Sequence, residues 1–511
     1  MDDNTLNTTP PSTTSPSTSG TVVCTPKNPQ LNTAEGQMAA CDGGTIQVTM
    51  GMFFDGTGNN KVNTNASKSG RSQNDSAHTS FFNSWSNVAR SSEYYIGSLN
   101  GVDIPETNTP KDDNIGGRFN IYIEGIGTNN NADDDFIRGL ALGIDFVSGI
   151  RPRVILGTKK AAQAIMEYEE IKNAINTITK IEVTFDVFGF SRGAAAARHF
   201  IDINNETYDS TSSSGLNFGG VFSSRLEFEI NELFEEFRKI EVEIHWRFAG
   251  LYETVSSHGL LDLLDFDNDV IEIGLNAISN VDSVLQIVAK DEYRRNFSLT
   301  NIDSVSNKDV ISIPGVHSDI GGGYSDTFYN GTDELNYQLY RVGYSPRLGA
   351  TISRAAAESI IDTIKNWFID QGWYTVHGLS TSTTSSGQSG GTISLIGTRG
   401  GIKNTYSHIP LHMMTNTAIE KGVNFNPALF SRYPIVDNIL NRIYDANSKS
   451  VNLGVLTNSE LKAFRRNYLH WSSRHNNIES LDPFINIEPN APRLDPQTNG
   501  YPKFKRKTID G

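Results

Sequence analysis

One short stretch of the chain, residues 181–200 (IEVTFDVFGFSRGAAAARHF), predicts a strand, a sharp turn and a helix in immediate succession. Apolar side chains at every second position from 181 to 187 alternate with polar ones, which is the period of a β-strand. The pattern G-x-S-x-G follows at residues 189–193, and then a run of alanines that favours a helix packed closely on a sheet. This order predicts an α/β fold in which Ser191 stands at a strand-to-helix turn.

Ser191 is a candidate nucleophile because of that position. A serine hydroxyl reacts poorly unless a base activates it and the backbone presents it clear of its surroundings, which a sharp turn does. The backbone N–H of Arg192 would then help to hold an oxyanion. The alternative is that Ser191 caps the helix that follows. A second match to the pattern, residues 387–391, lies in a Ser/Thr/Gly-rich run with no strand before it, so we interpret it as loop.

Small residues follow each of the first predicted strands. Residues 45–54 form a strand that runs into DGTGNN, where an amide of Gly56 or Thr57 would be the second oxyanion donor; a plain turn is the alternative. The strand predicted at 118–124 also ends in glycines, and a helical pattern at 159–177 leads back to the strand before Ser191. Strand, helix and strand in this order predict parallel strands joined by a right-handed crossover.

Two later strand ends carry a candidate acid and a candidate base. A strand at 242–248 leads to Glu253, and working residues of open α/β sheets lie beyond the carboxyl ends of strands. A short strand at 310–313 enters a glycine-rich loop that contains His317. The order Ser191, Glu253, His317 is that of the α/β hydrolases. The alternatives are a solvated carboxylate for Glu253 and a structural loop histidine for His317.

Second-tier candidates are Asp55, Asp319 and His412. Asp319 is close to His317 in sequence and is better suited to anchor the glycine loop, but it remains a fallback for the acid, as does Asp262. His412, beside two methionines, is the reserve base, although such a histidine more often belongs to a core.

The rest of the chain divides by composition and periodicity. We predict a disordered Ser/Thr/Pro-rich tail at 1–44, an α/β-hydrolase-like core with a mostly parallel sheet at 45–330, and a mainly helical lid or membrane-facing region at 331–480 with a mobile loop at 380–400. Residues 481–511 form an extended C-terminal arm, whose basic run KFKRK is a candidate for contact with an anion. Further helices are expected at 226–237, 283–297, 354–368 and 459–471.

Composition limits the possible partners. The net charge of −15, from 58 acidic and 43 basic residues, argues against a nucleic-acid partner and against general attraction to anionic lipid. No run approaches the roughly 18 apolar residues of a spanning helix, and the amino terminus lacks the features of a signal peptide. We expect Cys24 and Cys41 to be free thiols, with a disulfide as the alternative, and no metal or cofactor, because metal-binding spacings are absent.

Seven motifs, in order along the chain, resemble the first family of type VI secretion system lipase effectors, which are bacterial phospholipases of the α/β-hydrolase type. They are FFDGTGNN (53–60), YIEGIGT (122–128), GFSRGAAAAR (189–198), GLYETV (250–255), KDEYRRNF (290–297), GVHSDIGGGY (315–324) and YLHWSS (468–473).

The resemblance implies that Ser191 is the nucleophile and His317 the base, and that Glu253 stands where the family has an aspartate. It also implies hydrolysis of membrane glycerophospholipids of the phospholipase A1 or A2 type, secretion without a signal peptide on a spike protein, action in the periplasm of a target bacterium, and a cognate immunity protein. A hydrolase or acyltransferase of soluble esters, and a non-catalytic adaptor that docks on the spike, are the alternatives.

Overall fold

The structure is a computed structural model that describes residues 44–72, 75–96, 117–135, 149–209, 221–234, 239–256, 274–325, 334–345, 352–385, 390–475, 491–492, 494–495 and 503–510. The tail before residue 44, Cys24, Cys41 and Asp262 lie outside these residues. No helix within the described ranges is long and apolar enough to cross a membrane.

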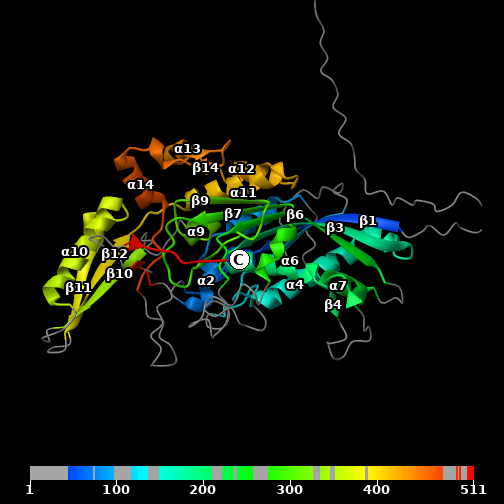
Figure 1. The fold of residues 1–511 in the computed structure, drawn as a ribbon, viewed down its shortest axis with the longest axis horizontal. Helices are drawn as coiled ribbons and strands as arrows, with labels where there is room; N and C mark the ends of the chain where they lie inside the picture. Colours follow the sequence, from blue (N-terminus) through cyan, green and yellow to red (C-terminus); the bar gives the residue numbers. More distant parts are fainter. Residues whose placement is uncertain are drawn as a thin grey trace, which may run out of the picture.

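A six-stranded sheet forms the centre of the molecule (Figure 1), in the order β2-β1-β3-β6-β7-β9, and every neighbouring pair is parallel. The mostly parallel α/β architecture predicted from the sequence is therefore confirmed. The strands are β1 (Gly44–Phe54), β2 (Arg118–Ile123), β3 (Ile178–Phe190), β6 (Glu241–Tyr252), β7 (Ser283–Ala289) and β9 (Lys308–Ile313).

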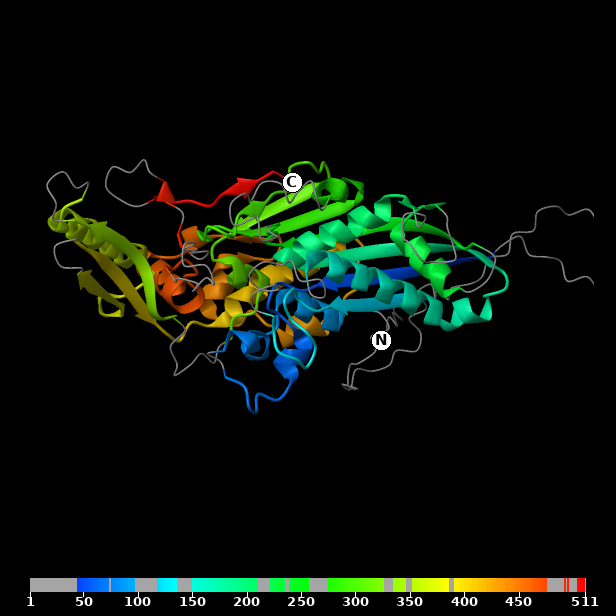
Figure 2. The same cartoon turned by 90° about the horizontal axis from the view of Figure 1, so that it is seen from below.

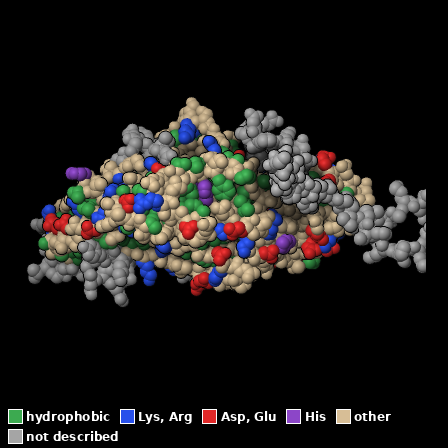
Figure 3. Space-filling model, turned by 90° about the horizontal axis from the view of Figure 1, so that it is seen from above, with side chains coloured by type: hydrophobic (Ala, Val, Ile, Leu, Met, Phe, Trp, Pro, Cys, Tyr) green, Lys and Arg blue, Asp and Glu red, His purple; other side chains and the backbone are tan. Residues whose placement is uncertain are grey.

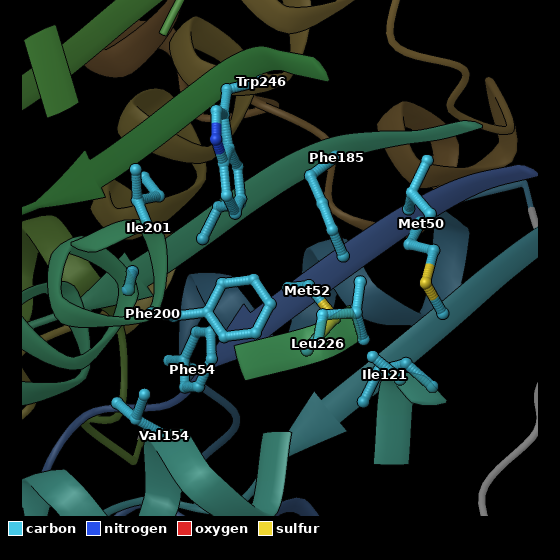
Figure 4. Packing of buried hydrophobic residues seen from close by; sticks show 14 of the residues in the cluster. Met50, Met52, Phe54, Ile121, Val154, Phe185, Phe200, Ile201, Leu226 and Trp246 are labelled. Carbon is cyan, nitrogen blue, oxygen red and sulfur yellow. The ribbon is translucent and has the colours of Figure 1, made fainter. Parts of the chain in front are cut away.

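Helices and loops cover both faces of the sheet. Alternate side chains of the central strands therefore enter two separate cores. On one face lie α4 (Ile150–Glu167), α6 (Arg192–Asn205) and α7 (Arg225–Leu233). In the core beneath them, Phe185 stacks on Trp246 at 5.0 Å between ring centroids and meets Phe200 edge to face at 5.3 Å (Figure 4). The opposite face packs against α3 (Asn87–Tyr94) and α11 (His408–Glu420).

The helix predicted at 283–297 was wrong, because this segment begins with strand β7. Residues 284–289 are all buried, between β6 on one side and β9 on the other. A strand buried on both faces loses the apolar and polar alternation that marks a half-exposed strand, so its periodicity cannot be distinguished from that of a buried helix.

The region from 334 to 475 contains a second sheet, so the prediction of a mainly helical region with a mobile loop at 380–400 was wrong in that part. Its antiparallel strands, in the order β10-β12-β11, are β10 (Glu334–Tyr344), β11 (Leu379–Ser385) and β12 (Gly391–Arg399). Figures 1 and 2 show this sheet and α10 (Arg354–Gln371) at one end of the molecule. The Ser/Thr run resembled a loop because every side chain of β11 after Leu379 is exposed.

The remaining elements are short, apart from α14 (Asn458–Tyr468), which was predicted. The helices are α1 (Lys61–Asn65), α2 (Thr79–Phe82), α5 (Glu169–Asn173), α9 (His317–Gly321), α12 (Ala428–Arg432) and α13 (Asn438–Ile443). The strands are β4 (Tyr208–Asp209), β5 (Val221–Phe222), β8 (Leu299–Thr300), β13 (Tyr444–Asp445), β14 (Ser450–Val451), β15 (Leu494–Asp495), β16 (Lys503–Phe504) and β17 (Thr508–Ile509).

Candidate active site

Ser191 lies between the end of β3 and the start of α6, in a backbone conformation that few non-glycine residues adopt. Its φ of 59° and ψ of −128° are strained for an L-residue, and strain of this kind is concentrated at functional sites. Although Ser191 holds the N-cap position, its side chain accepts no hydrogen bond from the amides of α6. The alternative interpretation of Ser191 as a capping serine therefore finds no support in this geometry.

The main chain of Ser191 is bonded to the neighbouring strand end on both sides of Glu253. Its N–H donates to the carbonyl of Tyr252 at 3.0 Å, and its carbonyl accepts from the N–H of Val255 at 3.3 Å. Glu253 itself has a φ of 51°, and its N–H donates to the carbonyl of Ile287 in β7 at 3.0 Å. The ends of β3, β6 and β7 thus hold the candidate nucleophile and the candidate acid next to each other in the fold.

His317, the first residue of α9, contacts the same carboxylate. Its Nδ1 lies 3.2 Å from Oε2 of Glu253, and both side chains are buried, with exposed fractions of 5% and 0%. An Nδ1–H that donates to a carboxylate leaves Nε2 without a proton and able to accept one. The structure therefore pairs the predicted base with the predicted acid, which are 64 positions apart in the sequence.

Two aromatic side chains pack on the His317 ring. Phe190, the residue before Ser191, lies 4.7 Å from the imidazole between ring centroids, and Phe297 meets the ring edge to face at 5.0 Å. Phe190 itself fills a narrow space, since a Cβ at Gly56 or at Gly321 would approach its ring to 2.4 or 2.0 Å. The packing therefore links the glycine loop after β1, the turn at Ser191 and the helix that begins at His317.

The pKa values of the pair shift in the directions that an acid and base couple requires. Burial lowers the pKa of His317 below 6.5, although Glu253 opposes this effect. Burial alone would raise the pKa of Glu253, but the positive charge of Arg506 and the contact with His317 outweigh it, so that the pKa lies below 4.5. At neutral pH the carboxylate is ionised and the imidazole is neutral.

The predicted oxyanion donors lie around this turn. The Arg192 amide is in the first turn of α6, where N–H groups have no acceptor within the helix. Its side chain donates from Nε to the hydroxyl of Thr57 at 2.8 Å and so connects the turn to the loop after β1. The Gly56 amide donates to Oδ1 of Asp55 at 2.7 Å, whereas no hydrogen bond of the described residues uses the Thr57 amide. Of the two loop amides, only that of Thr57 has no acceptor among the described residues, so it is the one available to an oxyanion.

Asp55 organises the loop after β1. It accepts hydrogen bonds from the hydroxyls of Ser86 and Tyr122, both at 2.6 Å, in addition to the one from Gly56. Burial raises its pKa to about 6, against the effect of these bonds. Through these contacts Asp55 fixes the conformation of the loop after β1.

Asp319 and His412 have partners other than the candidate triad. Asp319 pairs with His470, Oδ1 to Nδ1 at 2.7 Å, and its Oδ2 accepts from the amides of His470 and Val316 at 3.0 Å. Asp319 therefore anchors the glycine-rich loop, which the sequence favoured over the role of the acid. Nε2 of His412 lies 2.7 Å from the carbonyl of Tyr433, and its ring packs on Phe430.

Two residues that the sequence analysis did not single out complete the surroundings of His317. Glu292 accepts from the amide of His317 at 3.2 Å and from the guanidinium of Arg294 at 2.9 Å. Burial opposes its ionisation, but the charge and hydrogen bonds of Arg294, together with Arg506 and His317, outweigh burial and lower its pKa to about 2. The second is Arg506 of the run KFKRK, which contacts Glu253 at 2.8 Å. The sequence offered a signal for both, because Glu292 lies in the motif KDEYRRNF and the basic run was a candidate for contact with an anion.

In the described part of the chain, no three His, Cys, Asp or Glu side chains converge as metal ligands. The polar groups at these strand ends are of the kinds that acyl transfer uses, namely a hydroxyl at a strained turn, an imidazole paired with a carboxylate, and amides at a helix start.

The fold and this arrangement of residues define an α/β-hydrolase-like protein. Residues 204–338 match the family model described as "T6SS, Phospholipase effector Tle1-like, catalytic domain". The resemblance indicated by the sequence motifs is thereby confirmed, and this part of the chain is similar to the catalytic domain of Tle1-like type VI secretion effectors. The matched segment contains Glu253 and His317 and begins after Ser191.

A solved structure shares the fold of almost the whole chain. It is described as the Tle1 effector bound to the VgrG spike from the type VI secretion system, and the two are 20% identical with a TM-score of 0.54 over 91% of this chain and 96% of that one. An uncharacterized protein from Pseudomonas aeruginosa is 18% identical over 82% of this chain and 50% of that one, but its TM-score of 0.37 is too low to indicate a shared fold. No curated protein matches the chain.

Proposed function

We propose that this protein is a type VI secretion phospholipase effector that cleaves acyl esters of membrane glycerophospholipids by a serine mechanism. The observation that carries the proposal is the buried contact of His317 with Glu253, whose strand end is hydrogen-bonded to the strained turn of Ser191. The match of residues 204–338 to the Tle1-like catalytic domain supports the substrate class.

In the proposed mechanism, Ser191 attacks the ester carbonyl while Nε2 of His317 takes the hydroxyl proton. Glu253 keeps Nδ1 protonated and stabilises the imidazolium that forms. His317 then returns the proton to the leaving lysophospholipid oxygen. In the second half of the reaction, His317 takes a proton from water as the water attacks the acyl-enzyme, and it returns that proton to Ser191 as the fatty acid leaves. The amides of Arg192 and Thr57 hold the negative charge on the carbonyl oxygen in each tetrahedral intermediate.

The similarity to the family supports a proposal for the partners and the place of action. Because the solved relative is bound to a VgrG spike, we propose that a spike protein carries this chain out of the producing cell. Action in the periplasm of a target bacterium and a cognate immunity protein complete the proposal. Cleavage at either acyl position, of the A1 or the A2 type, is compatible with this mechanism.

Ser191→Ala tests the nucleophile. We expect lipid hydrolysis to fall by about three orders of magnitude or more, because the covalent step is lost, while the fold is retained. Ser389→Ala, in the second match to the G-x-S-x-G pattern, is the control and should hydrolyse lipid at the normal rate. A fluorophosphonate probe should label the native protein and the Ser389 variant, and labelling of the Ser191 variant would contradict the assignment.

Glu253→Gln and Asp319→Asn, compared side by side, test the acid. We expect the first to lose activity by about 10²-fold or more, because an amide cannot stabilise the imidazolium, and the second to lose mainly stability. An inactive Asp319 variant beside a fully active Glu253 variant would refute the proposed acid.

Phospholipid vesicles and a soluble short-chain ester, offered in parallel, test the substrate class. Faster turnover of the vesicle lipid supports the phospholipase, and mass spectrometry of the products from a lipid with two different chains identifies the acyl position. Cleavage of the soluble ester alone would indicate the soluble-ester hydrolase instead.

A further inference from the structure

Arg506, near the carboxyl end of the chain, is bound to the candidate acid. Its Nη1 donates to Oε1 of Glu253 at 2.8 Å, and its Nη2 lies 2.8 Å from Oε2. The side chain is 11% exposed and Glu253 is fully buried. Nε of Arg506 also donates to the carbonyl of Phe297 at 3.0 Å.

The segment that carries Arg506 is held on both sides. After it, β17 pairs with β8 in parallel, with Thr508 opposite Leu299 and Ile509 opposite Thr300. Before it, the Phe504 ring packs on Trp367 of α10 at 4.9 Å and on Trp471 at 5.2 Å. These contacts on both sides therefore hold Arg506 at one position in the structure.

The positive charge of Arg506 stabilises the ionised form of Glu253 in its buried position. A carboxylate without solvent contact stays ionised only where hydrogen bonds or a positive partner offset the effect of burial, which penalises the ionised form. His317 does not supply one in the resting enzyme, since it has to be neutral to accept a proton. Arg294 is committed to Glu292, with two contacts at 2.9 Å.

The geometry matters as well as the charge. Glutamate has one more rotatable bond than aspartate, so its carboxylate can take more orientations. The planar fork of Arg506 contacts both carboxylate oxygens, and the N–H of Ala289 donates to Oε1. These contacts leave Oε2 directed at Nδ1 of His317.

We infer that Arg506 is a positioning residue of the proposed triad, and that the C-terminal segment completes the active site by keeping Glu253 ionised and aimed at His317. The inference rests on the proposed function. Without Arg506, Glu253 would stay ionised mainly by pairing with a protonated His317, so His317 would hold its proton at a pH at which the native enzyme has a free base.

The test compares Arg506→Gln with Lys505→Gln, an exposed neighbour in the same run that loses the same charge. The readout is kcat and kcat/KM on a soluble short-chain ester from pH 5 to 9, with circular dichroism to establish folding. We expect Arg506→Gln to lose activity about tenfold at pH 7, with the acid limb of its profile about one unit higher and part of the activity recovered at high pH. Lys505→Gln should match the native protein.

A folded Arg506→Gln variant with the native rate and pH profile would overturn the inference. If that variant does not fold, Arg506→Lys decides, because it keeps the charge without the fork: we expect kcat to fall about threefold or more, and a native kcat would overturn the inference. Ser191→Ala, measured in parallel, separates the two hypotheses. Activity in Ser191→Ala refutes the proposed function, whereas a native-like Arg506 variant beside an inactive Ser191→Ala refutes the role of Arg506 alone.

Discussion

His317 is surrounded by groups that act on its proton in opposite directions. Burial and the positive charge of Arg294 favour the neutral imidazole, whereas Glu253 and Glu292 favour the imidazolium. Burial dominates, so the pKa lies below 6.5. A general base has to be unprotonated at the working pH, and this environment provides such a base at neutral pH without a metal ion or a cofactor in the proposed mechanism.

The direction of this shift predicts the pH dependence of activity. Because His317 must be neutral, kcat/KM should be level near pH 7 and fall only as the pH drops through the lowered pKa, which places the acid limb below pH 6.5. Glu253 should not contribute a limb in this range, since its pKa lies below 4.5. Rates on a soluble ester between pH 4 and 9 check this. An acid limb centred above pH 7 would show that a group other than His317 is the base.

The residues that the sequence could reveal were those set at strand ends. Ser191, Glu253 and His317 each follow a strand with a recognisable pattern, so the rule that parallel strands bring their carboxyl ends together was enough to group them. Arg506 followed no such rule, because it lies 253 positions from its partner in a segment with no periodic pattern. A contact between a loop and a distant strand end depends on how the whole chain closes.

At the scale of elements, the turn between β3 and α6 depends on how closely the helix approaches the neighbouring strand. A Cβ at Gly193 would lie 2.2 Å from the carbonyl oxygen of Asp55 and 2.4 Å from that of Phe54, both at the end of β1. The alanines that follow are completely buried against the sheet. Glycine at 193 therefore sets the distance between the nucleophile turn and the loop that carries the second oxyanion donor.

Gly193→Ala should consequently reduce both stability and activity. The obstructing atoms are backbone, so α6 has to move, and we expect a loss of about 1–3 kcal/mol in the free energy of unfolding and of about tenfold or more in kcat. Gly343→Ala is the matched control, because a Cβ there meets nothing within 4 Å. Chemical denaturation and ester hydrolysis measure the two effects. Native kcat in a folded Gly193 variant would mean that the turn tolerates a wider spacing.

The elements that the sequence misassigned share one physical cause. Strand β7 is buried on both sides and β11 is exposed on almost all of its length, so neither shows the alternation by which a strand is recognised. Strands with one buried and one exposed face, such as the first half of β6, were found. The pattern of side chains thus predicts an element well only where that element separates core from solvent.

At the scale of the whole molecule, buried contacts join the second sheet and the C-terminal segment to the α/β core. The guanidinium of Arg399 in β12 contacts both carboxylate oxygens of Glu334 in β10, at 2.7 and 2.8 Å, and Glu334 also accepts from the Trp471 amide at 2.5 Å. Phe504 packs on the same Trp471. The end of the molecule that carries α10 is therefore linked through Trp471 and Phe504 to Arg506 and the candidate active site.

Exposed apolar side chains lie on the upper face of the molecule, and they bear on how the protein would reach the membrane substrate of the proposed function. Figure 3 shows apolar side chains gathered near the centre of this face, on the side where Figure 1 shows α11, α12 and α13. Val436, between α12 and α13, is 69% exposed, and the half-buried Tyr433, Ile435 and Ile439 pack against the core beneath it. Since the net charge of −15 opposes general attraction to anionic lipid, we propose that apolar contacts of this segment bring the enzyme to the bilayer.

Val436→Asp is the prediction that tests this surface. An apolar side chain that enters the lipid interface contributes about 1–2 kcal/mol, and a carboxylate at the same place opposes insertion, so we expect binding to phospholipid vesicles and their hydrolysis to fall about tenfold or more. Hydrolysis of a soluble short-chain ester should not change, because Val436 makes no contact with the triad residues. Val221→Asp, at a site in β5 with a similar exposure of 63%, is the control and should behave as the native protein on both substrates. Equal losses for the two variants on vesicles would show that the added charge alone causes the effect. Native activity of Val436→Asp on vesicles would show that the membrane contact lies on another face.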